Sequence, residues 1–191
     1  MTTQVFLASG SPRRKELLTQ LGYQFELLSI DVEEVHQSHE TPLMYVERLS
    51  KDKAQAGVSA LELTTNKHVP VLGSDTIVVI DGVILEKPKD FEDAKRMLLA
   101  LSGRQHQVMT AVTLATPDDI RTKTVITQVW FRTLSEQEIE QYWESGEPCD
   151  KAGSYGIQGS GGRFVSRIDG SYHAVMGLPL METDQLLHQF L

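Results

Sequence analysis

The chain has 191 residues, of which 40% are hydrophobic, a formal net charge of −8 and a single cysteine. This length suits one sizeable core, so we expect a single domain over residues 1–191. The acidic balance argues against a broad surface for a nucleic-acid polymer, which would need an excess of basic residues. One cysteine excludes an intramolecular disulfide, and no apolar run approaches the roughly 18 residues of a membrane span. We therefore expect a cytoplasmic protein without a membrane segment.

The first informative stretch is LASGSPRRKE at residues 7–16. A short apolar run ends in small residues, and Ser11 and Pro12 suit the N-cap and the first position of a helix. Arg13 and Arg14 then lie in the first turn, where the helix dipole disfavours cations and favours a bound anion. We interpret residues 7–16 as a phosphate-binding turn. The alternative is an ordinary strand-to-helix turn with solvated arginines, and the stretch lacks the spacing of a P-loop.

The first helix should end near Gly22, and a strand is expected over residues 25–30. Asp31, Glu33 and Glu34 follow this strand. A run of carboxylates is usually a solvated acidic loop, but it also suits a hard metal ion. Both interpretations stay open at this point.

Thr41 and Pro42 repeat the capping pattern and begin a helix that should run to about residue 56, with Gly57 after it. Lys51 and Lys53 lie late in that helix. Favourable interaction with the negative end of the helix dipole could explain both lysines.

Asp75 lies between the apolar runs 69–72 and 77–80, in the sequence GSDT. A carboxylate in such surroundings should be largely buried, which is costly unless it is hydrogen-bonded, paired or bound to a metal. Hydroxyls of Ser74 and Thr76 could make it a hydrogen-bonded turn residue, or it could have a chemical role. Residues 81–82, Asp-Gly, predict a type I′ hairpin that pairs 77–80 with 83–85.

The second half of the chain alternates helical and strand patterns. A helix capped by Asp90 should end before Gly103, and the segments 105–116 and 121–132 predict a long antiparallel pair. Ser135 and Glu138 form a capping box for a helix to about residue 144. Strands are expected over 164–168 and 172–176, and a helix begins at 179. The aromatic residues near positions 130 and 142 suit a core better than a base-stacking surface.

Residues 147–162, EPCDKAGSYGIQGSGG, contain five glycines and few large apolar side chains. Such a segment is better suited to a binding or closing loop than to a regular element. Asp150 and Lys151 could form an internal ion pair, and Gln158 offers both a donor and an acceptor. The six histidines show no zinc-ligand spacing.

Four segments, SGSPRRKELL, GSDT with EKP, LSGR at 101–104 and DKAGSYGIQG, together resemble the Maf family of nucleotide pyrophosphatases. The resemblance covers nearly the whole chain in the right order. It implies a metal-dependent enzyme that cleaves a nucleoside triphosphate between its α and β phosphates. The implied fold is a mixed, elongated α/β sheet with flanking helices and two lobes around a cleft, similar to the inosine triphosphate pyrophosphatases. The family is commonly homodimeric.

The resemblance also implies roles for individual residues. Asp75 matches the catalytic acidic residue, and Glu34 with Asp75 would hold Mg²⁺ or Mn²⁺. Phosphate oxygens would be held by Ser9, Arg14, Lys53 and Lys87. The positions that sort the family by base are occupied by Arg13, Thr76 and Gln158, a combination that resembles the subgroup acting on dTTP and UTP.

Two other functions use the same residues. A nucleotide-binding regulator would hold the triphosphate without hydrolysing it, and family members have been linked to inhibition of septum formation. Such a regulator would not need a buried carboxylate beside the phosphates. A nucleotidyltransferase is the third interpretation, but the chain is short for an additional acceptor site.

Overall fold

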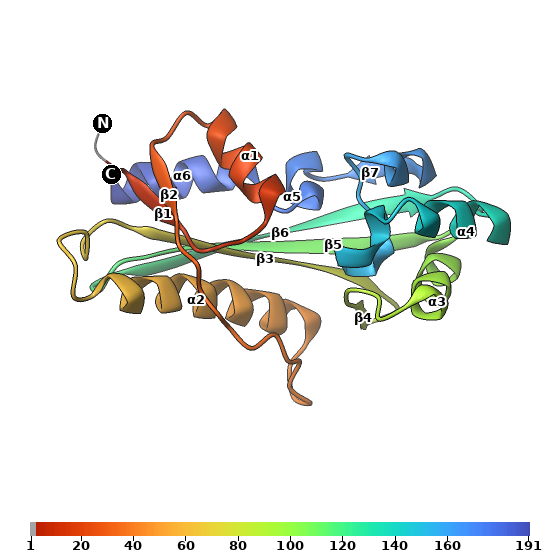
Figure 1. Ribbon diagram of the computed structural model, residues 1–191, viewed down its shortest axis with the longest axis horizontal. Coiled ribbons are helices and arrows are strands. Elements are labelled where there is room, and N and C mark those ends of the chain that lie inside the picture. The colour runs from red at the N-terminus through yellow and green to blue at the C-terminus, as the bar shows by residue number, and fades with distance from the viewer. Residues whose placement is uncertain (1–2) are drawn as a thin grey trace. The chain divides into compact units, whose positions relative to one another are not determined.

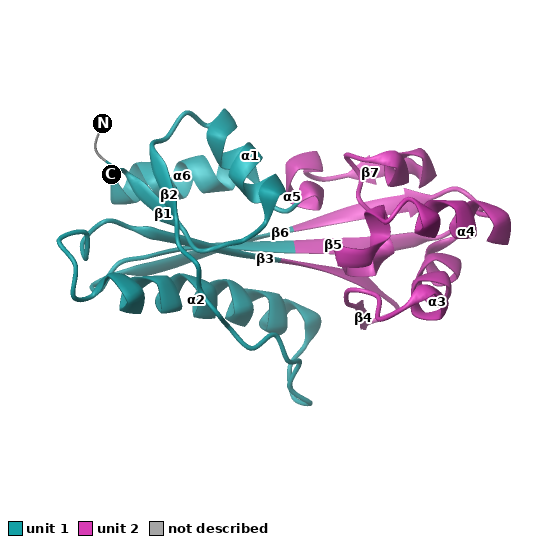
Figure 2. Cartoon of the chain, viewed as in Figure 1, with its two compact units in different colours: residues 1–75, 110–125, 177–191 teal, residues 76–109, 126–176 magenta. Residues whose placement is uncertain are grey.

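The computed structural model describes residues 3–191. These residues form two compact units (Figure 2). Unit 1 comprises the described residues up to Asp75 together with 110–125 and 177–191, and unit 2 comprises 76–109 and 126–176. The division passes through strands, so neither unit is one continuous piece of the chain.

The strands among the described residues form a seven-stranded sheet in the order β2-β1-β3-β5-β6-β7, with β4 paired to β3. Their bounds are β1 Val5–Leu7, β2 Phe25–Leu27, β3 Val71–Ile80, β4 Val83–Leu85, β5 Gln105–Ala115, β6 Ile120–Phe131 and β7 Val165–Asp169. β1 is parallel to β2 and β3, whereas β3 with β4 and β6 with β7 are antiparallel. The predicted mixed α/β fold is confirmed, and the two lobes around a cleft and the single domain stay predictions.

The helices are interspersed with these strands along the chain. Their bounds are α1 Pro12–Gln20, α2 Pro42–Leu61, α3 Phe91–Leu101, α4 Glu136–Glu144, α5 Tyr172–Met176 and α6 Leu180–Phe190, with short 3₁₀ turns η1 Glu147–Asp150, η2 Ala152–Ser154 and η3 Ser160–Phe164. In unit 1, α2 covers one side of the strands, and α1 and α6 lie on the other side (Figure 1).

Most predicted helix ends are confirmed by side-chain caps. Ser11, Thr41 and Asp90 each accept a hydrogen bond from a first-turn backbone N–H, and Ser135 forms the expected capping box with Glu138. The predicted Asp-Gly hairpin is also present, because Ile80 pairs with Val83 and both turn residues have positive φ. These features depend on neighbouring residues alone, which is why the sequence predicts them.

The expected end of the second helix at Gly57 was wrong. α2 continues to Leu61, and Gly57 lies inside it. A Cβ at this glycine would come within 2.5 Å of Val71 Cγ1. The glycine therefore permits close packing of α2 on β3 and does not end the helix.

Of the two interpretations of GSDT left open above, the turn is wrong. Residues 71–80 form the single strand β3, and Asp75 lies in its middle. A Cβ at Gly73 would collide with backbone atoms of α2, including the Ser50 carbonyl oxygen and, at 2.5 Å, the Ala54 nitrogen. Gly73 therefore allows α2 to approach β3 closely. In the sequence, a glycine needed for such packing looks the same as a glycine that forms a turn.

The strand expected over residues 172–176 is instead the short helix α5. Ser171 caps it, because its hydroxyl accepts from the Ala174 N–H at 3.1 Å. The loop expected over 147–162 contains η1, η2 and the first residues of η3, which continues to Phe164. The predicted ion pair within it is present, with Lys151 Nζ 2.8 Å from Asp150 Oδ1.

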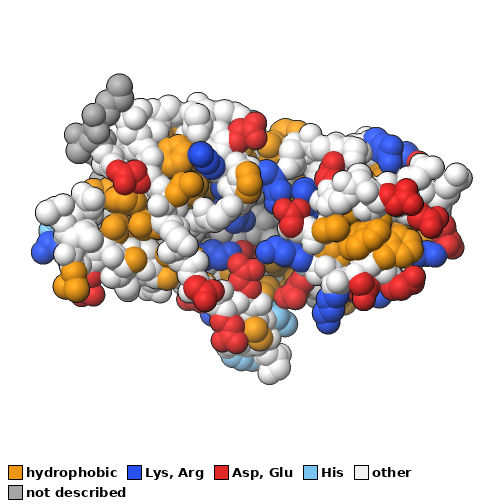
Figure 3. Space-filling model, in the orientation of Figure 1, with side chains coloured by type: hydrophobic (Ala, Val, Ile, Leu, Met, Phe, Trp, Pro, Cys, Tyr) orange, Lys and Arg blue, Asp and Glu red, His pale blue; other side chains and the backbone are white. Residues whose placement is uncertain are grey.

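The core of unit 2 is a cluster of buried aliphatic and aromatic side chains from its strands, α3 and α4. Acidic and basic side chains are interspersed over the face shown in Figure 3. No helix among residues 3–191 is both long enough and apolar enough to cross a membrane.

Candidate active site

The turn that we expect to bind phosphate lies at the N-terminus of α1, where Ser11 and Pro12 have the predicted positions. Ser11 Oγ accepts from the Arg14 N–H at 3.4 Å, and Ser9 Oγ accepts from the Ser11 N–H at 3.2 Å. Ser9 Oγ also lies 3.4 Å from Arg14 Nη1. The turn thus holds Ser9 and Arg14 together at a helix end whose dipole favours anions.

The guanidinium of Arg14 is held from its other side by the backbone. Its Nε donates to the Gly177 carbonyl oxygen at 2.8 Å. Burial lowers the pKa of Arg14, the negative charge of Asp75 opposes this change, and the neighbouring charge of Arg13 adds to it. A guanidinium stays charged in proteins, so the cost of its desolvation would be offset by a bound anion.

Lys53 lies between two carboxylates. Its Nζ is 2.6 Å from Asp75 Oδ1 and 2.6 Å from Glu34 Oε1. Lys53 and Asp75 are buried, whereas the side chain of Glu34 is 42% exposed. Asp75 therefore has the charged partner that its burial requires. The interpretation as a turn residue bonded by Ser74 is wrong, because the Ser74 hydroxyl donates to the backbone oxygens of Ala111 and Gly177.

The strand register explains why these residues meet. β1 and β2 are parallel, so the segments that follow their carboxyl ends leave the sheet at the same edge. Leu7 at the end of β1 pairs with Leu72 of β3, so Asp75 lies further along β3, beyond the end of β1. The edge of a sheet beyond its parallel strands is where ligands bind in many α/β folds.

Unit 1 therefore brings together six of the predicted site residues. Arg14 interacts electrostatically with Asp75, Glu34 and Arg13. The set, drawn from the phosphate-binding turn, the acidic segment after β2, α2 and β3, is Ser9, Arg13, Arg14, Glu34, Lys53 and Asp75.

The other three predicted residues, Thr76, Lys87 and Gln158, belong to unit 2. Thr76 follows Asp75 on β3, and Lys87 follows β4. Gln158 is exposed and lies between η2 and η3. Within unit 2, the Gly153 N–H donates to the Glu86 carbonyl oxygen at 3.1 Å, which connects the glycine-rich segment to the residue before Lys87.

The unit 1 residues provide some, but not all, of the ligands that a divalent metal ion needs. Glu34 and Asp75 offer hard oxygen ligands and share one cation, the ammonium of Lys53, between them. Among residues 3–191, no group of three or more His, Cys, Asp or Glu side chains could hold a metal ion. Since Mg²⁺ is often held by one or two carboxylates plus substrate phosphates, the two carboxylates suit a metal that arrives with a triphosphate.

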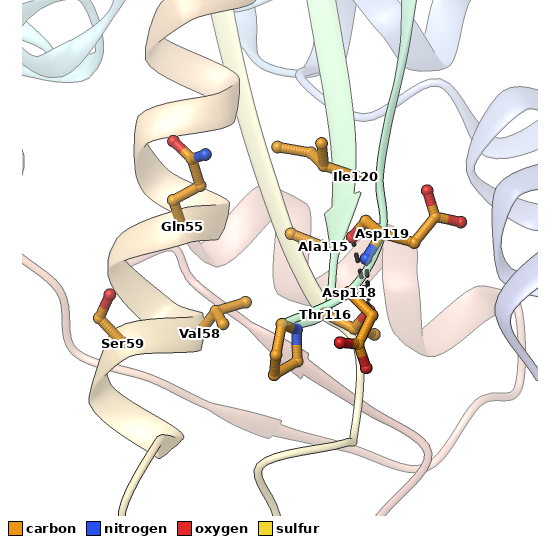
Figure 4. Close-up of a pocket in the computed structure, with 9 residues that line it drawn as sticks. Gln55, Val58, Ser59, Ala115, Thr116, Asp118, Asp119 and Ile120 are labelled. Atoms are coloured by element: carbon orange, nitrogen blue, oxygen red, sulfur yellow. Dashed lines mark hydrogen bonds between the residues drawn. The ribbon is translucent and has the colours of Figure 1, made fainter.

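A separate cavity of about 550 Å³ opens in unit 1 between α2 and the turn that joins β5 to β6 (Figure 4). It contains none of the nine predicted residues. Its lining consists of Gln55, Val58, Ser59 and residues 115–120.

Sequence reasoning missed two residues that support the site. The Gly177 carbonyl oxygen accepts from both Arg14 and Ser74. The Ser50 hydroxyl of α2 donates to Gly73 and to Thr113 Oγ1 of β5, at 3.2 and 2.8 Å. Both sets of contacts join segments that are far apart in the chain, so no local pattern could have revealed them.

Comparison with known proteins gives the family of this chain. A family model described as Maf-like protein matches residues 4–190, and the chain belongs to this family. The resemblance noted in the sequence is thereby confirmed. A protein of Aliivibrio fischeri is 91% identical over 191 residues, covering 100% of both chains. Relatives from Photobacterium profundum and Vibrio cholerae are 66% and 64% identical, each over 98% of this chain and over 97% and 98% of their own. All three are named dTTP/UTP pyrophosphatase.

Proposed function

We propose that this protein is a nucleoside triphosphate pyrophosphatase that hydrolyses dTTP and UTP to the monophosphate and pyrophosphate. The observation that carries the proposal is the unit 1 group, in which a buried carboxylate, Asp75, is held by Lys53 beside Arg14. Full-length relatives named dTTP/UTP pyrophosphatase support the substrate.

Cleavage of a phosphoanhydride needs neutralisation of charge, an oriented water and a base for its proton. Arg14, Ser9 and Lys53 supply donors for phosphate oxygens, and the resemblance adds Lys87. Asp75 orients the water that attacks the α phosphorus and accepts its proton. The bond between the α phosphorus and the oxygen that bridges it to the β phosphate then breaks, and pyrophosphate leaves with that oxygen.

Glu34 and Asp75 would hold Mg²⁺ or Mn²⁺, and the ion would neutralise charge on the phosphates. Lys53 gives these carboxylates a cation of their own. Its ammonium keeps the two negative charges paired before a nucleotide is bound.

The base is recognised by Arg13, Thr76 and Gln158. Uracil and thymine each present two carbonyl acceptors and one N–H donor. The donors of Arg13 and the mixed amide of Gln158 match this pattern, and a hydrogen-bonding site strongly rejects analogues that leave its groups unpaired. The single cysteine further supports a location in the reducing cytoplasm, and the family resemblance supports a homodimer.

The proposal is tested by measuring pyrophosphate release from dTTP, UTP, GTP and ITP with Mg²⁺ or Mn²⁺. We expect turnover of the two pyrimidine substrates ahead of the purines. The Asp75→Asn variant should lose at least about 10²-fold in kcat, the lower range for a missing general base. Asp118→Asn, at an exposed turn outside the group, is the matched control and should retain activity.

Near-normal turnover by folded Asp75→Asn protein would refute the catalytic role. Binding of dTTP without release of pyrophosphate by the wild-type protein would instead favour the nucleotide-binding regulator. Faster hydrolysis of GTP or ITP would overturn the assignment of the base.

A further inference from the structure

The carboxylate of Glu147, at the start of η1, is surrounded by hydrogen-bond donors of unit 2. Its Oε1 accepts from the Tyr142 hydroxyl at 2.7 Å and from the Gly161 N–H at 3.0 Å. Its Oε2 accepts from both the N–H and the hydroxyl of Ser160, each at 2.9 Å. One side chain thus satisfies four donors. Three of them are more than ten positions from it in the sequence, and the fourth, the Tyr142 hydroxyl, belongs to α4.

Tyr142 extends the same network to the beginning of the segment. Its hydroxyl donates to Glu147 and accepts from the Gly156 N–H at 3.1 Å. Lys151 Nζ donates to the Glu147 carbonyl oxygen at 2.7 Å. The backbone on both sides of Gln158 is therefore tied to a single carboxylate and its tyrosine partner.

The glycines of this segment are explained by the same contacts. A Cβ at Gly159 would lie 2.5 Å from the Glu147 carboxylate, and one at Gly161 would lie 2.5 Å from the Tyr142 hydroxyl oxygen. A Cβ at Gly156 would lie 2.7 Å from Lys151 Cε. The backbone can approach these groups only because it carries no side chains there.

Burial opposes ionisation of Glu147, but hydrogen bonds from the Gly161 N–H, the Tyr142 hydroxyl and Ser160 outweigh it and lower the pKa of the carboxyl group. The side chain is anionic at neutral pH. Hydrogen bonds to a charged acceptor are stronger than those between neutral groups, so the network holds the segment firmly.

We infer that Glu147 is a positioning residue that fixes the backbone of residues 156–161 and thereby presents Gln158 to the pyrimidine base. This inference rests on the proposed function, in which Gln158 contacts the base. Gln158 is exposed, so its direction depends on the backbone that carries it. A segment held in its binding conformation loses less entropy when the nucleotide binds.

The test uses Glu147→Gln, which keeps the shape of the side chain and replaces one acceptor oxygen with an NH₂ group. In either orientation of the amide, that group faces one backbone N–H, of Gly161 or of Ser160, and one hydroxyl that can turn to accept from it. At least one backbone hydrogen bond is therefore lost, and the negative charge that strengthens the others is removed. Tyr142→Phe removes the hydroxyl that joins Glu147 to Gly156. Glu144→Gln, an exposed carboxylate at the end of α4, is the matched control.

Hydrogen exchange measures the positioning without any assay of activity. In Glu147→Gln we expect the amides of Gly156, Ser160 and Gly161 to exchange about tenfold faster, because the charged acceptor that protects this segment is gone. Amides of β5 should keep their wild-type rates. Acceleration across all of unit 2 would show a general loss of stability and overturn the inference, as would unchanged exchange in residues 156–161.

Hydrolysis measures the consequence for the base. Glu147→Gln and Tyr142→Phe should raise KM for dTTP by about tenfold and narrow the preference for dTTP over GTP, because a displaced Gln158 forms weaker hydrogen bonds. The kcat for dTTP should change much less, since Asp75 and Lys53 lie in unit 1. An equal loss of kcat with all nucleotides, or an unchanged preference, would contradict the positioning role.

The two proposals fail in different ways. If the wild-type protein shows no preference for pyrimidines, the proposed function fails, and the exchange rates of residues 156–161 alone decide whether Glu147 holds the segment. If the wild-type preference is present and both variants retain it, the positioning role fails while the proposed function stands.

Discussion

At the scale of single residues, His106 of β5 shows how burial changes the chemistry of one side chain. Its Nε2 lies 2.8 Å from the Tyr155 hydroxyl oxygen, and its ring contacts Phe131 edge-on with centroids 5.0 Å apart. Among the described residues, its Nδ1 has no hydrogen-bond partner. Burial lowers the pKa of His106 from 6.5 to about 4 and raises the pKa of Tyr155. His106 is therefore a neutral residue of the core of unit 2.

This lowered pKa predicts a loss of stability in acid. Between pH 6.5 and about 4 the unfolded chain binds a proton at His106 and the folded chain does not, so stability falls as the pH is lowered through this window. The full change is about 3 kcal/mol, because each pKa unit corresponds to 1.36 kcal/mol. Urea unfolding at pH 7, 5.5 and 4.5 measures it, with His106→Gln as the non-titrating control. An identical pH dependence in the two proteins would contradict the prediction.

At the scale of elements, the approach of α2 to β3 sets the distance between Lys53 and Asp75. Gly73 of β3 faces the backbone of α2, whereas Gly57 of α2 faces only side-chain atoms, the nearest of them in Val71. A methyl group at Gly73 must move a helix backbone, which is harder than rotating a side chain. We therefore expect Gly57 to tolerate replacement by alanine better than Gly73 does.

We expect Gly73→Ala to destabilise the protein by about 1–3 kcal/mol, the usual cost of overpacking a core. It should also lower kcat, since it separates the elements that carry Lys53 and Asp75. Gly57→Ala should cost less, because alanine favours a helix over glycine by about 1 kcal/mol and offsets part of the strain. Chemical denaturation and pyrophosphate release of both variants test this. A Gly73→Ala protein as stable as Gly57→Ala would argue against the backbone contact.

Sequence reasoning succeeded where structure depends on neighbours in the chain. The caps at Ser11, Thr41 and Asp90 and the Asp-Gly hairpin use local hydrogen bonds, and all are present. It failed at Gly57 and left a turn open at Gly73, because a glycine needed for close packing has the same sequence signal as one needed for a turn. The strand predicted over 172–176 overlooked the Ser171 cap of α5.

The candidate site was predictable to a similar degree. The turn at Ser9 and Arg14 was visible in the sequence, and Asp75 was expected to be buried and to need a partner. That the partner is Lys53 depends on how α2 packs on β3, which no local pattern specifies. The carboxylate of Glu147 was overlooked for the same reason, because its donors come from α4 and η3.

At the scale of the whole molecule, the boundary between the two units passes through three strands. β3, β5 and β6 each have residues in unit 1 and residues in unit 2. Each of these strands continues without a break from one unit into the other, so unfolding of one unit would fray the strand ends that remain in the other. This arrangement predicts that the units unfold together and not one after the other.

The two tryptophans make this prediction testable, because Trp130 and Trp143 both lie in unit 2. Tryptophan fluorescence therefore reports unit 2 alone, whereas far-UV circular dichroism reports helices and strands of both units. For a single cooperative transition the two probes give the same midpoint in urea. Gly73→Ala, a change in unit 1, should then lower the fluorescence midpoint as much as the dichroism midpoint. If the fluorescence midpoint were unchanged by this substitution, unit 2 would fold on its own. The expectation of one domain over residues 1–191 would then be wrong.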